Sequence, residues 1–399
     1  MSKIARRYVI SIGGRVIAAV LQAAMVALLA RSLGVENYGL YAIVSSIVLF
    51  ALSIADLGMA TAVLRLAADE YRQRAIGTIV LWRAFVTSLC LAASAAAGFL
   101  TDQNFALLYV ATAVYMSGEM AGDTAVGVLQ GERRAAAAMT LLIVRRLTAV
   151  VPFWFGVGLP QAYAALIVAG GVGFTLFIAI AATRSARPLP IREFLRTRGG
   201  IAVTSFGRNL ANLDSFIVGA TSGAQLAGLY GAAARLGNPI NIAISTLVQV
   251  AIPELSVRQS PQQRYQDFRR MRPLVLLFGG LVALASLTAP WLVQILFGPD
   301  FAGAAPILAA VFVGAGFSAV AQLHMSWFVA TRIPRSVSVG AVLTGVFGLV
   351  LLALLSSLLG VWGCAIAIVL WRATTLTIVL LSWYATTRVF RRPNPDLNA

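Results

Sequence analysis

The sequence has few charged residues, a single lysine, one histidine and two cysteines. Only 11% of its 399 residues are charged and 59% are hydrophobic, whereas a soluble domain carries about 25% charged residues. This composition excludes a sizeable soluble domain and indicates a polytopic membrane protein. Cys90 and Cys364 lie far apart in apolar runs, which favours packing roles. Because potential metal ligands are so scarce, we predict no metal site, no catalytic residue and no bound cofactor.

The net charge of +17 does not indicate a nucleic-acid partner. The basic residues are nearly all arginines, and they are spread over short gaps between apolar runs of membrane-spanning length. The sequence therefore predicts contact with membrane lipids and no nucleic-acid binding.

Apolar runs of about 20 residues, the length that crosses the hydrocarbon core, recur twelve times. The predicted spans are 9–30, 39–63, 76–100, 105–129, 136–158, 161–182, 200–221, 224–251, 273–297, 302–330, 335–357 and 361–386. We expect the first to be a retained span and not a signal peptide, because Arg15 interrupts it. The basic gap 183–199 divides the spans six and six, which predicts two lobes, residues 1–190 and 191–399.

The distribution of Lys and Arg over the gaps predicts the orientation, because cytoplasmic loops carry an excess of both. Alternate gaps, including both termini, hold 23 of these residues, and the remaining gaps hold Arg31 alone. Both termini are therefore predicted to face the cytoplasm, and the outer loops are predicted to be very short.

An internal repeat links the two halves of the chain. "RSLGVENYGLYAIVSS" (31–46) aligns with "ATSGAQLAGLYGAAAR" (220–235) at a fixed offset of 189. The offset pairs Gly34 with Gly223, Gly39 with Gly228, Leu40 with Leu229 and Tyr41 with Tyr230. Parallel halves of this kind are a transporter architecture with the substrate site between them near the membrane midplane. The alternative is that a glycine-containing turn recurs by chance.

Several segments, in order along the chain, resemble one family. They are "ARSLGVENYGLYA", "ADLGMATAVLR", "LQGERRAAAAMTLLIVRRL", "NLDSFIVGATSGAQLAGLYGAAARLGNP" and "ILFGPDFAGAAPILAAVF". Together they resemble the bacterial polysaccharide flippases of the MOP superfamily, which also contains the MATE multidrug exporters and the lipid II flippases. This chain is at the short end of the family, with twelve spans and no additional pair.

The resemblance implies an all-α polytopic fold, with two six-helix lobes around a central cavity lined by helices one, two, seven and eight. It implies alternating access that moves an undecaprenyl-pyrophosphate-linked oligosaccharide from the cytoplasmic to the periplasmic leaflet of the bacterial inner membrane. A gradient of Na⁺ or H⁺ often drives such transport. Polysaccharide polymerase or assembly proteins are partners that this role suggests.

Seven arginines lie within predicted spans, where each charge costs roughly 2.5–3.5 kcal/mol. They are Arg15, Arg83, Arg145, Arg146, Arg208, Arg235 and Arg372. Guanidinium groups bind phosphate oxygens bidentately and stay protonated. Arg15, Arg208 and Arg235 lie on spans that the resemblance places around the cavity, so we predict that they bind the pyrophosphate. For Arg208 the alternative is a structural ion pair with Asp56 or Asp214.

Arg145 and Arg146 are further candidates for the pyrophosphate site. Adjacent helical residues point about 100° apart, so one can face the cavity while the other pairs with the neighbouring span. Glu119 and Asp123 are four apart and share a face of that span. The sequence leaves open whether this cluster binds cargo or is purely structural.

The intramembrane carboxylates Asp56, Asp214, Glu119 and Asp123 are candidates for ion coupling, because such groups often mark ion or proton pathways. The alternative role for each is to neutralise an arginine. His324 is expected to be a hydrogen-bonded structural residue and not a titrating one.

Gln22, Asn209 and Asn212 are candidates for contacts to sugar hydroxyls, with interhelical hydrogen bonding as the alternative. A rival function is a MATE-type exporter of drugs or other small molecules. Seven intraspan arginines against four carboxylates favour an anionic cargo over the organic cations that such exporters carry. A membrane enzyme is disfavoured, because the outer gaps are too short to hold a catalytic loop.

Overall fold

The computed structural model describes residues 3–56, 70–101, 103–132, 134–182, 206–207, 209–257, 261–330 and 334–387. All regular structure in these ranges is helical. The N-terminal helices are α1 (Lys3–Asp56), α3 (Glu70–Thr101), α4 (Gln103–Gly131), α5 (Ala135–Val150), η1 (Val151–Phe155) and α6 (Leu159–Ala182). The C-terminal helices are η2 (Leu210–Leu213), α9 (Asp214–Val257), α10 (Pro261–Leu284), η3 (Ala285–Thr288), α11 (Ala289–Phe297), η4 (Pro299–Ala304), α12 (Ala305–Ala330) and α13 (Arg335–Thr387).

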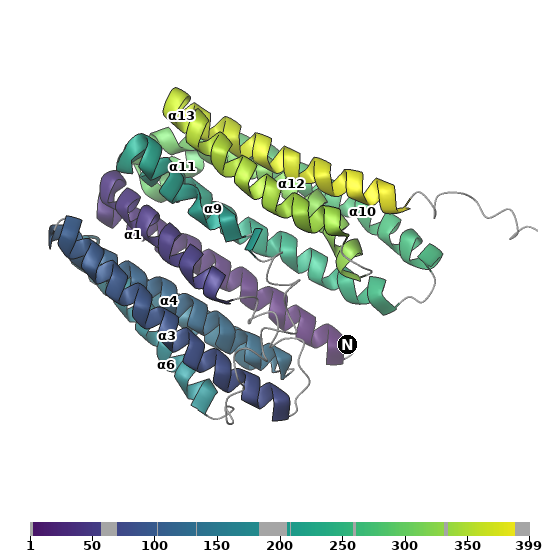
Figure 1. Ribbon diagram of the computed structural model, residues 1–399, viewed down its shortest axis with the longest axis horizontal. Helices are drawn as coiled ribbons and strands as arrows, with labels where there is room; N and C mark the ends of the chain where they lie inside the picture. Colours follow the sequence, from purple (N-terminus) through teal and green to yellow (C-terminus); the bar gives the residue numbers. More distant parts are fainter. Residues whose placement is uncertain are drawn as a thin grey trace, which may run out of the picture.

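Three long helices are interrupted by a glycine in a left-handed conformation. These are Gly34 in α1 (φ 72°), Gly223 in α9 (φ 87°) and Gly360 in α13 (φ 56°). Positive φ is accessible to glycine without the steric cost that a Cβ imposes. Figure 1 shows α1 and α13 doubling back on themselves, so that each contains two consecutive membrane spans.

The helices agree with most of the predicted spans. Within the described ranges, seven helical stretches are long and apolar enough to cross a membrane, and two of these are the doubled helices α1 and α13. Helix α4 and the part of α9 after Gly223 coincide with the predicted spans 105–129 and 224–251, whereas residues 200–205 and 208 of the predicted seventh span lie outside the described residues. The protein is therefore a multi-pass membrane protein.

The helices form two groups that meet along α1 and α9 (Figure 1). The N-terminal lobe contains α1 to α6, and the C-terminal lobe contains α9 to α13. Neighbouring helices approach closely at small residues: a Cβ added at Gly118 of α4 would lie 2.2 Å from the carbonyl oxygen of Gly170 in α6. The predicted lobe boundary at residues 190 and 191 lies outside the described residues.

The repeated glycines bring the backbones of the two lobes close together. A Cβ added at Gly39 would lie 1.8 Å from the carbonyl oxygen of Ala224, and one added at Gly228 would lie 2.1 Å from that of Val35. Gly34 and Gly223 share their backbone conformation, with ψ values of 173° and 169°. The repeat thus corresponds to a turn that occurs once in each lobe and packs backbone to backbone against its counterpart.

A second contact joins the lobes at the same end, which the positive-inside bias predicts to be the outer one. Arg31 donates from Nε to the carbonyl oxygen of Leu296 (2.9 Å) and from Nη2 to that of Ile295. These carbonyls belong to the last turn of α11, where helical hydrogen bonds are not available. The side chain of Arg31 therefore caps a helix of the opposite lobe.

Candidate functional site

A cavity of about 280 Å³ lies between the two lobes. Residues of α1, α4 and α5 line one side of it, and residues of η2 and α9 line the other. Among its lining residues are seven that the sequence singled out: Gln22, Glu119, Asp123, Arg146, Asn212, Asp214 and Arg235. Helices four and five contribute to this wall in addition to the four spans that the resemblance implied.

Arg235 projects from α9 of the C-terminal lobe and contacts α1 of the N-terminal lobe. Its Nη2 donates to the hydroxyl of Ser45, and its guanidinium carbon lies 4.3 Å from the ring centroid of Tyr41. Such a cation–π contact contributes about 0.5–2 kcal/mol. Among the described residues, no carboxylate lies within ion-pair distance of Arg235. Its direct contacts are therefore a hydroxyl group and an aromatic face, and the carboxylate of Asp214 in the same cavity attracts it electrostatically without forming an ion pair.

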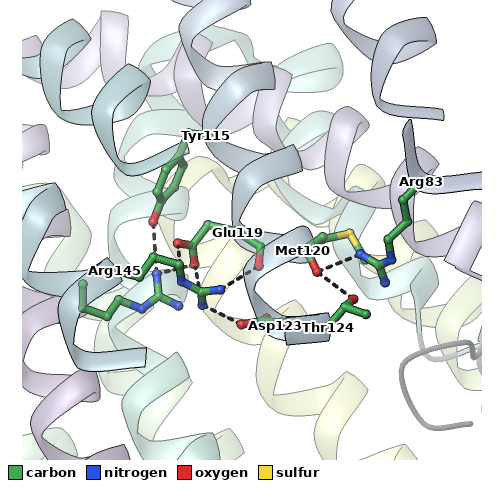
Figure 2. A network of polar contacts seen from close by, with 8 residues as sticks. Arg83, Tyr115, Glu119, Met120, Asp123, Thr124 and Arg145 are labelled. Atoms are coloured by element: carbon green, nitrogen blue, oxygen red, sulfur yellow. Dashed lines mark hydrogen bonds and ion pairs between the residues drawn. The ribbon is translucent and has the colours of Figure 1, made fainter. Parts of the chain in front are cut away.

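Arg145 is different, because two carboxylates neutralise it. Its side chain is fully buried, and it lies 2.5 Å (Nη2) from Asp123 Oδ1 and 3.3 Å (Nε) from Glu119 Oε1. It also donates from Nη1 to the backbone carbonyl of Glu119 (3.0 Å). Figure 2 shows Arg145 beside both acidic side chains of α4. This is a structural ion pair of the kind that requires multiple well-placed hydrogen bonds when buried.

Arg146 lines the central cavity, as the 100° separation from Arg145 allows. It forms an ion pair with Glu119 and donates to the hydroxyl of Tyr115 (3.3 Å). Glu119 is therefore shared by the two arginines. The arrangement predicted from the spacing, in which one arginine faces the cavity and the other pairs with α4, is observed.

Asp214 lies at the start of α9 and is held by neutral donors. Its Oδ1 accepts from the backbone N–H and the hydroxyl of Ser215 (2.6 and 3.2 Å), and its Oδ2 accepts from the hydroxyl of Tyr230 (3.1 Å). No arginine among the described residues forms an ion pair with it. Asp214 is thus an intramembrane carboxylate without an ion-pair partner among the described residues, although Arg235 attracts it electrostatically, and its role in ion coupling stays a prediction.

The two asparagines connect the lobes. Asn209 donates from Nδ2 to the carbonyl oxygen of Ser53, and Asn212 donates from Nδ2 to the hydroxyl of Ser53, each at 3.2 Å. Both amides thus share one face, as their spacing predicted, and both make the interhelical bonds that were the alternative to sugar contacts. Asn212 also lines the central cavity, whereas Asn209 is not among its lining residues.

Besides Arg145 and Asn209, three further predicted site residues are not among the residues that line the cavity. Arg15 is half-buried on α1 and is attracted electrostatically to Asp123, without being among the lining residues. Arg208 lies outside the described residues, and so does the side chain of Asp56. The structure therefore brings Arg235 and Arg146 to the cavity and leaves the predicted cage of Arg15, Arg208 and Arg235 untested.

Sequence reasoning missed the hydroxyl groups that surround these charges. Ser45, Ser53 and Tyr115 had no distinguishing pattern, because serine and tyrosine in a membrane helix commonly bond to their own helix or to a neighbour. Tyr41 and Tyr230 carried a signal that was not used for the site: they are repeat partners, and each contacts a charged group at the cavity.

Comparison with solved structures defines the class of fold. The chain resembles a multidrug resistance MATE family transporter of the MOP superfamily in its inward-facing conformation (13% identity, TM-score 0.71, covering 97% of this chain and 99% of that one). It also resembles the lipid II flippase MurJ in an inward closed conformation (12%, 0.75, 94% and 87%). A third similar structure is a MOP superfamily transporter from Pyrococcus furiosus (14%, 0.63, 97% and 96%). At these identities the likeness shows the fold, and it confirms the predicted class.

The sequence comparison identifies the family. The model of the polysaccharide biosynthesis protein family matches residues 4–259, which is more than half of the chain. The chain therefore belongs to the polysaccharide biosynthesis protein family, as the resemblance of its segments indicated. No match was found among curated proteins. Family and fold together define a membrane transporter of the flippase type.

Proposed function

We propose that this protein moves an undecaprenyl-pyrophosphate-linked oligosaccharide from the cytoplasmic to the periplasmic leaflet of the bacterial inner membrane by alternating access. The single observation that carries the proposal is the environment of Arg235. It is an arginine in a cavity between two lobes of a membrane protein, and its described partners are a hydroxyl and an aromatic ring.

The position of Arg235, and not the count of charges, supports an anionic cargo, because the cavity wall carries two arginines (Arg146 and Arg235) and three carboxylates (Glu119, Asp123 and Asp214). Arg145 and Arg146 form ion pairs with Glu119 and Asp123. Arg235 forms no ion pair with a described residue, and Asp214 attracts it electrostatically without direct contact. A charge at this depth is unfavourable unless it is paired or faces a polar cavity. A pyrophosphate supplies several oxygens that a guanidinium binds bidentately, so cargo binding would provide the missing counter-charge.

The same contact offers a link between binding and lobe movement. Arg235 belongs to the C-terminal lobe, while Ser45 and Tyr41 belong to the N-terminal lobe. A phosphate oxygen competes with Ser45 for the guanidinium N–H groups, so cargo binding would weaken a bond between the lobes. Differential contacts of this kind are what allows a ligand to shift a conformational equilibrium.

A coupling ion, Na⁺ or H⁺, would act at Asp214 in this proposal. Glu119 and Asp123 serve as counter-ions of arginines in the observed conformation, whereas Asp214 is held by Ser215 and Tyr230. Asp214 also lines the central cavity. Its charge state would therefore change the potential that an anionic cargo meets there.

The test is leaflet exchange of a fluorescent undecaprenyl-pyrophosphate oligosaccharide in liposomes that contain the wild-type chain, Arg235→Gln or Arg269→Gln. Arg269 is an exposed arginine of α10 and serves as the matched control. We expect at least a tenfold slower exchange for Arg235→Gln, because a hydrogen bond to a charged group contributes about 1.5–3 kcal/mol. Wild-type exchange by Arg235→Gln would contradict the site. A wild-type protein that moves an organic cation and no lipid would support the exporter.

A further inference from the structure

A second cavity, of about 170 Å³, lies within the C-terminal lobe between α9, α12 and α13. Its wall includes Arg372, Trp371, Ser318 and Tyr230. Ala211, Asn212, Asp214 and Ala234 line both cavities, so the two spaces share one wall. A molecule in the central cavity thus has a second polar compartment directly beside it.

Arg372 lies within a membrane-spanning helix and forms no ion pair with a described residue that would account for its charge. Its guanidinium carbon lies 5.6 Å from the ring centroid of Trp371, and no carboxylate of the described chain lies within ion-pair distance. Its aliphatic stem fills a space that a glycine leaves open, since a Cβ added at Gly314 would lie 2.9 Å from Arg372 Cγ. Ionisable residues inside a membrane mark substrate or ion pathways by default.

Trp371, like Arg372, is held in place by packing against a glycine. A Cβ added at Gly348 would lie 2.0 Å from the Trp371 ring, so the indole occupies the place where any other residue would carry its side chain. The ring is only 6% exposed. Arg372 and Trp371 are therefore held by two glycines of neighbouring helical segments, which gives this cavity a preorganised cation and a preorganised aromatic face.

Neutral hydrogen-bonding groups complete the wall. The Ser318 hydroxyl donates to the carbonyl of Gly314 (2.9 Å), and the Tyr230 hydroxyl donates to Asp214 (3.1 Å). Both oxygens keep acceptor capacity toward the cavity. A cation, an aromatic face and hydroxyl acceptors suit a sugar ring that carries a carboxylate. A bare phosphate would need the cation but neither the aromatic face nor the hydroxyl acceptors.

Asp214 lines both cavities, so its negative charge acts on an anion in either one, and Arg235 offsets that charge in the central cavity. The negative charge of Asp214 repels any anion in the second cavity, and the Coulomb energy grows in proportion to the charge of that anion. A singly charged sugar carboxylate therefore meets a smaller penalty than a pyrophosphate. Arg235, on the other side of the shared wall, remains the ligand for the pyrophosphate.

We infer that the second cavity is a subsite for a carboxylated sugar of the cargo, with Arg372 as the residue that selects it. This inference rests on the proposed function, because the cargo must place a sugar beside the central cavity. It goes beyond that function by naming the class of glycan: one with an acidic sugar near the lipid pyrophosphate.

The first experiment measures binding without transport. The purified full-length chain in detergent is titrated with a soluble disaccharide that contains glucuronic acid, and with the same disaccharide containing glucose. Thermal stability reports binding, because a ligand that binds only the folded state raises it. The variants are Arg372→Gln, Ser318→Leu, which fills the cavity and keeps the charge, and the exposed control Arg269→Gln.

We expect the acidic disaccharide to bind the wild type and Arg269→Gln at least tenfold more tightly than the neutral one. Arg372→Gln should lose this preference, and Ser318→Leu should bind neither sugar well. A wild type without preference, or an Arg372→Gln variant that keeps it, would overturn the inference. If Arg372→Gln fails to fold, the test rests on Ser318→Leu. An unchanged affinity of Ser318→Leu for the acidic disaccharide would overturn the inference.

A second experiment measures the binding of inorganic pyrophosphate in the same way. Its binding should fall in Arg235→Gln and stay unchanged in Arg372→Gln; the reverse pattern would make the second cavity a phosphate site and refute the sugar assignment. Lipid exchange in liposomes tests the proposed function separately. Acidic-sugar selectivity without lipid exchange would refute the flippase and keep the subsite, whereas exchange without selectivity would refute the subsite alone.

Discussion

The backbone contact between the repeated glycines predicts how a single methyl group changes the conformational equilibrium. In Gly39→Ala the new Cβ would lie 1.8 Å from the carbonyl oxygen of Ala224, whereas ordinary van der Waals contact begins at 3.4 Å. The lobes must therefore separate by about 1.6 Å at this point. Because the opposing atom belongs to the backbone, no change of side-chain rotamer can relieve the overlap.

The energy follows from the packed arrangement alone. Overpacking of this kind costs about 1–3 kcal/mol, and the better helix propensity of alanine cancels, because residue 39 is helical in both arrangements. The contact between these ends of the lobes should thus weaken by about 2 kcal/mol, which is roughly a 30-fold shift toward the open arrangement. The matched control is Gly127→Ala in α4, where an added Cβ meets nothing within 4 Å.

The assay is a distance measurement between spin labels at Glu36 and Gln225, which are exposed repeat partners on opposite lobes. Cys90 and Cys364 are first replaced by serine. Gly39→Ala should add a population of longer distances, and Gly127→Ala should match the starting protein. Identical distance distributions in all three proteins would refute the role assigned to the glycine contact.

Three further predictions concern charged side chains. Arg145→Gln should lower the free energy of unfolding in detergent by about 1–3 kcal/mol, because it removes the ion-pair partner of Asp123 and leaves Glu119 with Arg146 alone; a loss below about 0.5 kcal/mol would contradict the structural ion pair. Arg31→Ala should lengthen the same spin-label distance, since it removes the cap on the opposite lobe, and an unchanged distance would show that the cap is dispensable. Tyr41→Leu should weaken pyrophosphate binding more than Tyr41→Phe, which keeps the ring beneath Arg235; equal effects would exclude the cation–π contact as a contributor.

The sequence by itself determined the membrane character, the approximate position of most spans and the repeat. These features are local: the length of an apolar run sets the span, and glycine alone adopts the positive φ of Gly34 and Gly223 at low cost. Spacing on two neighbouring helices also predicted that one of Arg145 and Arg146 pairs with Glu119 or Asp123, but not which one. In these cases the relevant neighbours are close in sequence or fixed by helical period.

The tertiary structure alone decided which arginines lack a counter-ion. Spacing places a residue on one face of its helix, but not the rotation of that helix against partners more than a hundred residues away. Arg235 faces Ser45 and Tyr41 of the other lobe, and Arg372 faces a cavity formed by three helices. Whether a buried charge is neutralised depends on such distant contacts, so Arg145 and Arg146 are distinguished as members of ion pairs, and Arg235 and Arg372 as candidate ligands, only after the helices have packed.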